Sequence, residues 1–296
     1  MSVVHDSMTT VQLQRSPFER RALRNGVLTV GAWTAALIAG IPLISVLYML
    51  IVRGGARLGW EALSTLPPAG FEMGGGFGNA IVGTVVMVGL GGLLSIPVGV
   101  LAAIFLAELG PTRRLSRIAR FATKTLTGMP SILAGVFAYA VVVLLTGTYS
   151  APAGGLALAV LMLPTVILTA EGAIKAVPKI TRDAAYGMGC TRSQVIWKVM
   201  LPSAAPGIIT GVMLAVARAA GETAPLLFTA LFSSYWLFDS GAKLMQPTAS
   251  LAVLIYNFAG MPFDNQIELA WAASLVLVLI VLIINVVSRL VGQRRA

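Results

Sequence analysis

The chain has 296 residues, of which 57% are hydrophobic and only 11% are charged, and its mean hydropathy is +0.88. Soluble domains carry about 25% charged residues, so this composition excludes an ordinary water-soluble protein. The net charge of +10 does not indicate a nucleic-acid-binding protein, because the bases form no patch interleaved with aromatic residues and no zinc-ligand pattern is present. With Cys190 and His5 as the only cysteine and histidine, we expect no internal disulfide, no metal site and no catalytic residue.

Long apolar runs predict that the chain crosses a membrane as helices. Strands of a membrane barrel are about ten residues long and alternate in polarity, whereas these runs are continuous and about twice that length or more. Long helices also satisfy their own backbone hydrogen bonds in lipid. We therefore predict an all-α polytopic membrane protein with about six spans. The runs cover about 26–52, 79–107, 121–146, 154–177, 203–233 and 270–292.

The distribution of basic residues predicts the orientation of the spans. Of the 21 Lys and Arg residues, 17 fall on the side of the two termini, three fall on the other side, and Arg218 lies inside a run. Bases are retained in the cytoplasm, so both termini are predicted to be cytoplasmic. The domain plan is then a cytoplasmic tail 1–25, a membrane domain 26–292 and a short cytoplasmic tail 293–296. The apolar segment 250–260 is too short to span, and it is either an interfacial or re-entrant piece or a surface loop.

The polar connection between the fourth and fifth runs has a regular pattern. It contains an acidic residue, two alanines, a glycine after three more residues, and a Leu-Pro pair at the next membrane entry. Glycine permits a sharp turn between two short helices at positive φ. The pattern resembles the EAA loop of ABC-importer permeases, with aspartate in place of the usual glutamate. The residues are Asp183, Ala184, Ala185, Gly189, Leu201 and Pro202.

This resemblance implies that segment 183–202 is a coupling loop that docks onto a separate ATPase subunit. The alternative is an ordinary amphipathic helix at the membrane surface. The chain has no Gly-x4-Gly-Lys-Ser/Thr run, which is the loop that cradles nucleotide phosphates. ATP and Mg are therefore expected in the partner, and this subunit is expected to be a non-enzyme without a cofactor of its own.

Arg218 and Glu222 are two charged residues within the fifth apolar run. Counting from Ile208 at about 1.5 Å per residue places Arg218 near the bilayer midplane. Charges at that depth usually face a bundle interior or an aqueous path, and a spacing of four puts both residues on one helix face. A guanidinium suits an oxyanion such as phosphate, because it offers paired planar donors. The alternative is a buried ion pair that only fixes helix packing.

Four segments resemble the PstA-type permeases of phosphate importers, rather than the sister PstC type. The most specific of them reads Arg-Ala-Ala-Gly-Glu-Thr-Ala-Pro-Leu from Arg218 onward. One difference is Leu168, which stands about where members of that family carry a base on span four. The segments are 217–228, 95–103, 128–132 and 268–273.

The PstA resemblance implies a type I ABC importer permease fold and half of the pathway of an ATP-driven, high-affinity phosphate importer in the bacterial inner membrane. The implied partners are a PstC-like permease, a PstB-like ATPase dimer, a PstS-like periplasmic phosphate-binding protein and membrane lipid, without nucleic acid. The pathway residues that we expect are Arg218, Glu222, Thr223 and Ser131.

Two further features are open to alternative interpretations. Gly128-Met129-Pro130 predicts a break or kink in the third run, because proline lacks the N–H of a regular helix. A half-helix from Ser131 would direct free N–H groups at a central path and suit an anion, whereas a packing kink would not. Glu171 and Lys175 lie one turn apart near the end of the fourth run and predict a local surface pair.

Three other functions compete with phosphate import. An ABC permease for sulfate, molybdate or phosphonate would share the coupling loop but not the Gly-Glu-Thr-Ala-Pro run. An ion-coupled secondary transporter would leave the coupling loop unexplained. A membrane enzyme would need paired carboxylates, a metal cluster or a Ser/His set, which the apolar runs do not contain.

Overall fold

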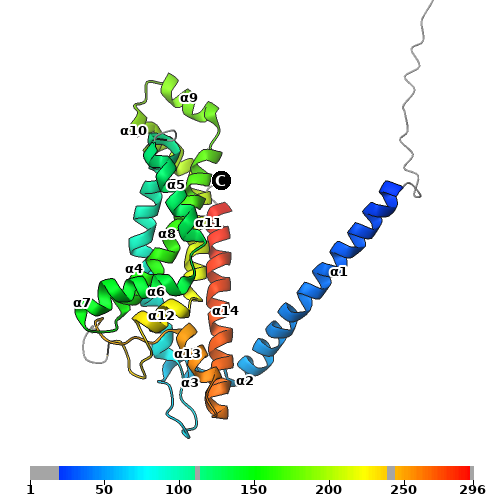
Figure 1. Ribbon diagram of the computed structural model, residues 1–296, viewed down its shortest axis with the longest axis vertical. Helices are drawn as coiled ribbons and strands as arrows, with labels where there is room; N and C mark the ends of the chain where they lie inside the picture. The colour runs from blue at the N-terminus through cyan, green and yellow to red at the C-terminus, as the bar shows by residue number, and fades with distance from the viewer. Residues whose placement is uncertain (1–19, 111–113, 239–243, 294–296) are drawn as a thin grey trace, which may run out of the picture. The chain divides into compact units, whose positions relative to one another are not determined.

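The computed structural model describes residues 20–110, 114–238 and 244–293, and within them the chain is helical, without strands (Figure 1). Most of the expected tail 1–25 and nearly all of the tail 293–296 lie outside the described residues. Met1–Met49 and Leu50–Ala296 form two units, and each is described by itself. The first unit contains α1 (Arg20–Met49), a long apolar helix with Pro42 inside it.

The second unit holds the remaining helices, several of which contain π-helical turns (labelled η). Its first half consists of η1 (Leu50–Gly54), α2 (Gly55–Arg57), α3 (Trp60–Ser64), α4 (Gly78–Ile104), η2 (Phe105–Leu109), α5 (Arg114–Thr127), α6 (Ser131–Ala138), η3 (Tyr139–Val143) and α7 (Leu144–Thr146). Its second half consists of α8 (Ala151–Ala176), α9 (Lys179–Gly187), α10 (Arg192–Gln194), η4 (Val195–Met200), α11 (Leu201–Ala220), α12 (Ala224–Thr229), α13 (Leu251–Ala259) and α14 (Asp264–Gln293).

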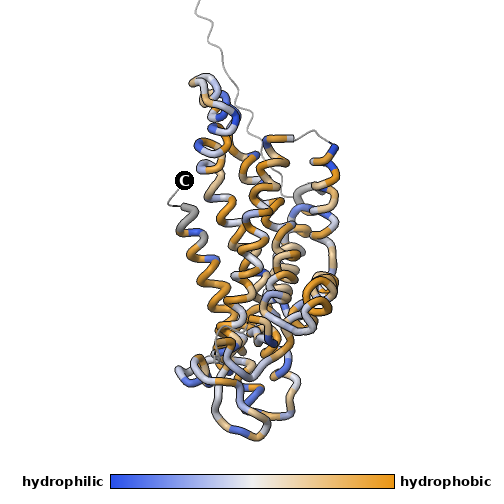
Figure 2. Tube along the Cα trace, turned by 90° about the vertical axis from the view of Figure 1, so that its left-hand side faces the viewer, coloured by the Kyte–Doolittle hydropathy of each residue, from blue (hydrophilic) through white to orange (hydrophobic). Residues whose placement is uncertain are grey.

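The predicted all-α polytopic membrane fold is confirmed. In the described part of the chain, five helices are long and apolar enough to cross a membrane, or six if the bent pair α5 and α6 counts as one span. Figure 2 shows hydrophobic residues along the long helices and hydrophilic residues gathered toward their ends. The expected runs 79–107, 154–177 and 270–292 correspond to α4, α8 and α14.

The central helix of the second unit is α8, which packs along α4 and α11. Its side chains Leu158, Met162 and Val166 are fully or almost fully buried. Small residues bring the helices close: a Cβ added at Gly99 of α4 would lie 2.7 Å from Val166 Cγ1. Helices in lipid gain little from hydrophobic burial and associate through such close packing.

A second cluster surrounds α13, which packs against α14 and α4. Leu251 and Leu254 are fully buried, and the N–H of Leu251 donates to Thr84 Oγ1 on α4 at 2.9 Å. The surface-loop interpretation of segment 250–260 is therefore wrong, because the segment is a short helix whose apolar face lies in the protein.

Two of the expected apolar runs are broken in the structure, and the break in the third run falls where Gly128-Met129-Pro130 predicted a break or kink. In place of the run 121–146, α5 and the helix from Ser131 to Thr146 meet at an angle of 106° around Gly128–Pro130, which is a break rather than a kink. The run 203–233 is interrupted as well, since α11 ends at Ala220 and α12 begins at Ala224. Hydropathy alone did not reveal these changes of direction.

The second unit has two distinct ends (Figure 1). The short helices α9 and α10 lie at the end where α14 finishes. The helices α2 and α3 lie at the opposite end, where α14 begins. Functional features are found at both ends and between them.

Candidate functional site

The expected coupling loop forms a compact turn between two short helices. Gly189 has φ +84°, its N–H donates to the carbonyl of Tyr186 at 2.9 Å, and the N–H of Cys190 donates to the carbonyl of Ala185 at 3.2 Å. These two bonds define a Schellman motif, which ends α9 and needs a left-handed residue where a Cβ would be strained. The positive φ expected of a glycine in this loop is found at Gly189.

The next helix begins at Arg192, three residues after this glycine. Thr191 Oγ1 accepts from the N–H of Gln194 at 3.4 Å, and Gln194 Oε1 accepts from the N–H of Thr191 at 2.8 Å. This reciprocal capping box fixes where the helix starts. From Arg192 the chain then continues as one helical stretch to Ala220. The turn is thus joined through this helical stretch to α11.

The coupling element, defined as residues 179–202, is exposed except on one side. Ala185 is buried and Leu201 is half-buried, whereas Asp183, Ala184, Gly189 and Pro202 are exposed. The element also exposes apolar side chains, with Ile180 and Met188 both more than three-quarters exposed. Clustered exposed apolar side chains on a polar element are typical of a surface that contacts another protein.

Glu108, at the end of η2, joins the coupling element to the second long helix. Its Oε1 lies 2.8 Å from Arg182 Nη1 of α9, and the Glu108 side chain is only 10% exposed. The Glu108 carbonyl also accepts from Arg192 Nη2 of α10. One residue therefore contacts both short helices of the coupling element.

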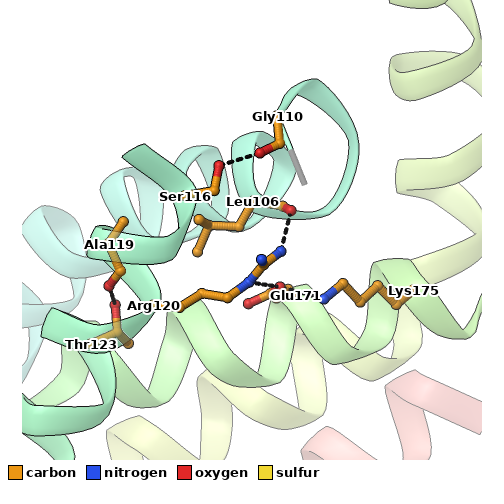
Figure 3. A network of polar contacts seen from close by, with 8 residues as sticks. All are labelled: Leu106, Gly110, Ser116, Ala119, Arg120, Thr123, Glu171 and Lys175. Carbon is orange, nitrogen blue, oxygen red and sulfur yellow. Dashed lines mark hydrogen bonds and ion pairs between the residues drawn. The ribbon is translucent and has the colours of Figure 1, made fainter. Parts of the chain in front are cut away.

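A second polar network also involves η2, and it joins η2 to α5 and α8 (Figure 3). Glu171 of α8 is 2.8 Å from Arg120 Nε of α5 and 2.5 Å from Lys175 Nζ. Arg120 Nη2 also donates to the carbonyl of Leu106 in η2 at 2.6 Å. The interpretation of Glu171 and Lys175 as a local surface pair is wrong, because Glu171 is buried and its carboxylate is shared with a base 51 residues earlier.

Arg218 and Glu222 form an ion pair at a helix end. Arg218 lies in the last turn of α11, Glu222 lies beyond that helix, and Nε to Oε1 measures 3.6 Å. The Arg218 side chain is 55% exposed and that of Glu222 16%. The end of α11 stabilises a base electrostatically, and the exposed face leaves the guanidinium free to meet another group.

The depth of Arg218 follows from its neighbours. Val216 and Ala220, on either side of it, line an apolar hollow of about 520 Å³ with Ile280 and Ile284 of α14. Those two residues lie within the uncharged stretch 269–288, beyond its middle. The helix break after Ala220 therefore occurs well inside the apolar layer.

Both helix breaks lead into half-helices that pack together. Ser131 begins α6, and Thr223 precedes α12. A Cβ added at Gly135 of α6 would lie 2.6 Å from Pro225 Cα of α12, so the two backbones are in close contact. Among the described residues no hydrogen bond or ion pair joins Ser131 to Arg218 or Glu222, although α6 packs against α12, which begins two residues after Glu222.

The sequence analysis missed the residues that tie the coupling element down. The contacts of Glu108 with Arg182 and Arg192 join residues 74 and 84 positions apart, so no local spacing could identify the pairs. One feature of the sequence could have indicated Glu108. It is a lone carboxylate between an apolar run and a basic connection, where an arginine or lysine of another loop can pair with it.

Residues 95–296 match the family described as binding-protein-dependent transport system inner membrane component. The chain is 38% identical over 282 residues to the phosphate transport system permease protein PstA of Haemophilus influenzae, covering 95% of this chain and 98% of that protein. It is 37% identical to PstA of Pasteurella multocida, covering 94% and 98%. The probable PstA of Methanocaldococcus jannaschii is 36% identical, covering 88% and 90%.

Solved structures share the fold at low sequence identity. A bacterial alginate ABC transporter in complex with its periplasmic protein gives a TM-score of 0.63 at 14% identity, covering 94% of this chain and 98% of that chain. The methionine ABC transporter MetNI in an inward-facing conformation gives 0.56 at 20% identity, covering 74% and 93%. The two breaks and the coupling element thus occur within a fold known from ABC importers.

Proposed function

Because the chain belongs to the family of binding-protein-dependent transport system inner membrane components, and within it to the PstA permeases, we propose that it is the permease subunit of an ATP-driven phosphate importer. The observation that carries the mechanism is the exposed coupling element, turned at Gly189 and held to the second long helix through Glu108. This subunit moves substrate and leaves ATP hydrolysis to a partner.

The coupling element receives the force of the ATPase. Ile180, Met188 and the exposed backbone around Gly189 provide the contact surface, and Arg182 passes its movement to Glu108. The helical stretch that starts at Arg192 passes it to α11 and so to Arg218. A displacement at one end of the molecule is thereby converted into a change at the helix break inside the membrane.

Arg218 contacts the phosphate or gates its path. Its guanidinium offers paired donors to an oxyanion, and it is exposed on the single subunit, so that a second permease can complete the path around it. Glu222 holds the guanidinium while the path is empty. Ser131 and Thr223 lie at the starts of the two half-helices and contribute polar groups beside this path.

The complete importer contains a PstC-like permease, two PstB-like ATPase subunits with ATP and Mg, and a PstS-like periplasmic phosphate-binding protein. The end with the coupling element faces the cytoplasm together with both termini, in the inner membrane. The positive-inside distribution of bases supports this orientation.

The test is phosphate uptake by liposomes that contain the four-component complex. We expect uptake to require ATP inside and the binding protein outside, and to be unaffected by ionophores that collapse ion gradients. Uptake that persists without ATP and stops with ionophores would favour a secondary transporter. Preferential uptake of sulfate, molybdate or phosphonate would assign the subunit to another oxyanion.

A further inference from the structure

A charged hollow lies at the end of the molecule opposite the coupling element, between the turns η1 and α2 and the start of α14. It has a volume of about 680 Å³. Charged side chains of both signs line it, together with apolar ones. The residues used below are Arg53, Arg57, Asp264, Glu268, Ile267 and Trp271.

The four charged groups do not neutralise one another. Within the described chain, no ion pair joins either arginine to Asp264 or Glu268. Arg53 instead lies over the ring of Trp271, with Cζ 5.8 Å from its centroid, and Arg57 Nη2 donates to Asn265 Oδ1 at 3.4 Å. Two guanidinium groups and two carboxylates thus face one hollow with zero net charge and without direct pairing. A ligand with one positive and one negative group would satisfy both sets.

The hollow lies at the level of lipid headgroups. After Glu268, α14 has no charged residue from 269 to 288, a stretch of about 30 Å, which equals the hydrocarbon thickness of a bilayer. Before Arg53, the first apolar run has no charged residue from 25 to 52. Both charged sets therefore stand where the apolar layer ends. Trp271 belongs to the aromatic residues that favour this interface.

An apolar hollow lies beside the charged hollow. This second hollow of about 310 Å³ shares Ile267 and Trp271 with it and is otherwise lined by residues such as Ile255, Ala259 and Ala270. It reaches Ser274, one turn further along α14 into the apolar stretch. A headgroup in the charged hollow would thus have room for part of an acyl chain beside it.

We propose that the charged hollow binds a phospholipid whose headgroup carries a phosphate and a primary ammonium, as phosphatidylethanolamine does. Arg53 and Arg57 hold the phosphate, and Asp264 and Glu268 hold the ammonium. An anionic headgroup is disfavoured, because the two carboxylates repel it. Free inorganic phosphate, the other source of the same anion chemistry, is disfavoured for the same reason and offers no group for the carboxylates.

The experiment is native mass spectrometry of the purified four-component complex after incubation with equal amounts of phosphatidylethanolamine and phosphatidylglycerol. Wild-type complex should retain the ethanolamine lipid in preference. Arg53→Gln with Arg57→Gln should lower its retention about tenfold, the loss expected from about 1.4 kcal/mol of binding free energy. Asp264→Asn with Glu268→Gln should keep phospholipid bound but lower the preference for ethanolamine over glycerol by a similar factor.

Arg114→Gln with Arg117→Gln removes two exposed bases of α5, outside both the hollow and the coupling element, and should leave lipid retention unchanged. Equal retention in the arginine variant and the wild type would overturn the site. Displacement of the lipid by inorganic phosphate would identify an anion site instead, and displacement by the binding protein would identify a protein contact; either result overturns the proposal.

The lipid proposal rests on the proposed function in one respect only. The orientation given by that function decides which leaflet of the membrane supplies the lipid. Lipid retention is measured without ATP or uptake, so its failure is distinguishable from failure of transport.

Discussion

Gly189 is held at φ +84° by the two hydrogen bonds that end α9, and open space surrounds the position where its Cβ would be. A Cβ there would therefore meet no neighbour, and its penalty is the left-handed backbone, about 1–2 kcal/mol. Gly187 is a matched neighbour, because its added Cβ also meets open space while its φ is ordinary.

We predict that Gly189→Val lowers phosphate uptake and weakens ATPase binding, because α9 would no longer end in the same turn and the coupling element would change shape. Gly189→Asn should be milder, since asparagine tolerates the left-handed region better. Gly187→Ala should transport normally. Uptake and co-purification of the ATPase with the membrane subunits are the measurements. Normal uptake by the valine variant would contradict the assignment of this segment as the coupling element.

A second residue-scale prediction separates substrate contact from packing at Arg218. If the arginine only neutralises Glu222, removal of both charges restores transport, because no lone charge remains in the membrane. We expect instead that Arg218→Gln with Glu222→Gln assembles normally but loses uptake at least about tenfold. Arg218→Lys should retain little activity, because an ammonium lacks the paired planar donors. Membrane abundance, assembly and uptake are measured together. Full uptake by the double variant would leave Arg218 a packing residue.

At the scale of elements, the sequence predicted the long helices better than the contacts among them. The spans α4, α8 and α14 followed from apolar runs, since length and hydropathy suffice to identify a membrane helix. The sequence also predicted a break or kink at Pro130, because proline cannot continue a regular helix, but it did not predict the angle of 106°. The break after Ala220 was missed, because Gly221-Glu222-Thr223 is short and its flanks are apolar.

The burial of Glu171 was missed for a related reason. Its i,i+4 partner Lys175 is visible in the sequence, but the base that covers its other side, Arg120, lies 51 residues earlier, just before the third apolar run. The motif predicted two short helices with a glycine turn between them, and the structure has α9, the turn at Gly189 and α10 there. Its attachment to Glu108 was not visible, because that contact exists only after the helices have packed.

We predict that Glu108 and Arg182 act as one unit in positioning the coupling element. Glu108→Gln and Arg182→Gln should each weaken ATPase binding, and the double variant should be little worse than either, with a coupling free energy of about 1–3 kcal/mol. Lys198→Gln, an exposed base on the same element, serves as the control for lost charge. Titration of the membrane subunits with the ATPase gives the affinities. If the losses of ATPase-binding free energy in the two single variants simply add in the double variant, then Glu108 and Arg182 act independently.

At the scale of the whole molecule, the coupling element lies at the opposite end of the second unit from α2 (Figure 1), whose residues line the charged hollow. The mechanism needs the coupling element in the cytoplasm, where the ATPase is, and the lipid site then belongs to the outer leaflet. Two exposed methionines test this arrangement directly. Met73 is 87% exposed, in the connection between α3 and α4, and Met188 is 77% exposed, in the coupling element.

The background for the test is Cys190→Ser, which removes the native cysteine. In it, Met73→Cys should react with a membrane-impermeant maleimide added to intact spheroplasts. Met188→Cys should react only after the membrane is permeabilised. The spheroplasts should lack the ATPase subunit, which would otherwise cover Met188; both side chains are then highly exposed, so a difference in labelling reports the side of the membrane and not burial. Labelling of Met188→Cys in intact spheroplasts would invert the orientation, and the coupling element could then not reach a cytoplasmic ATPase.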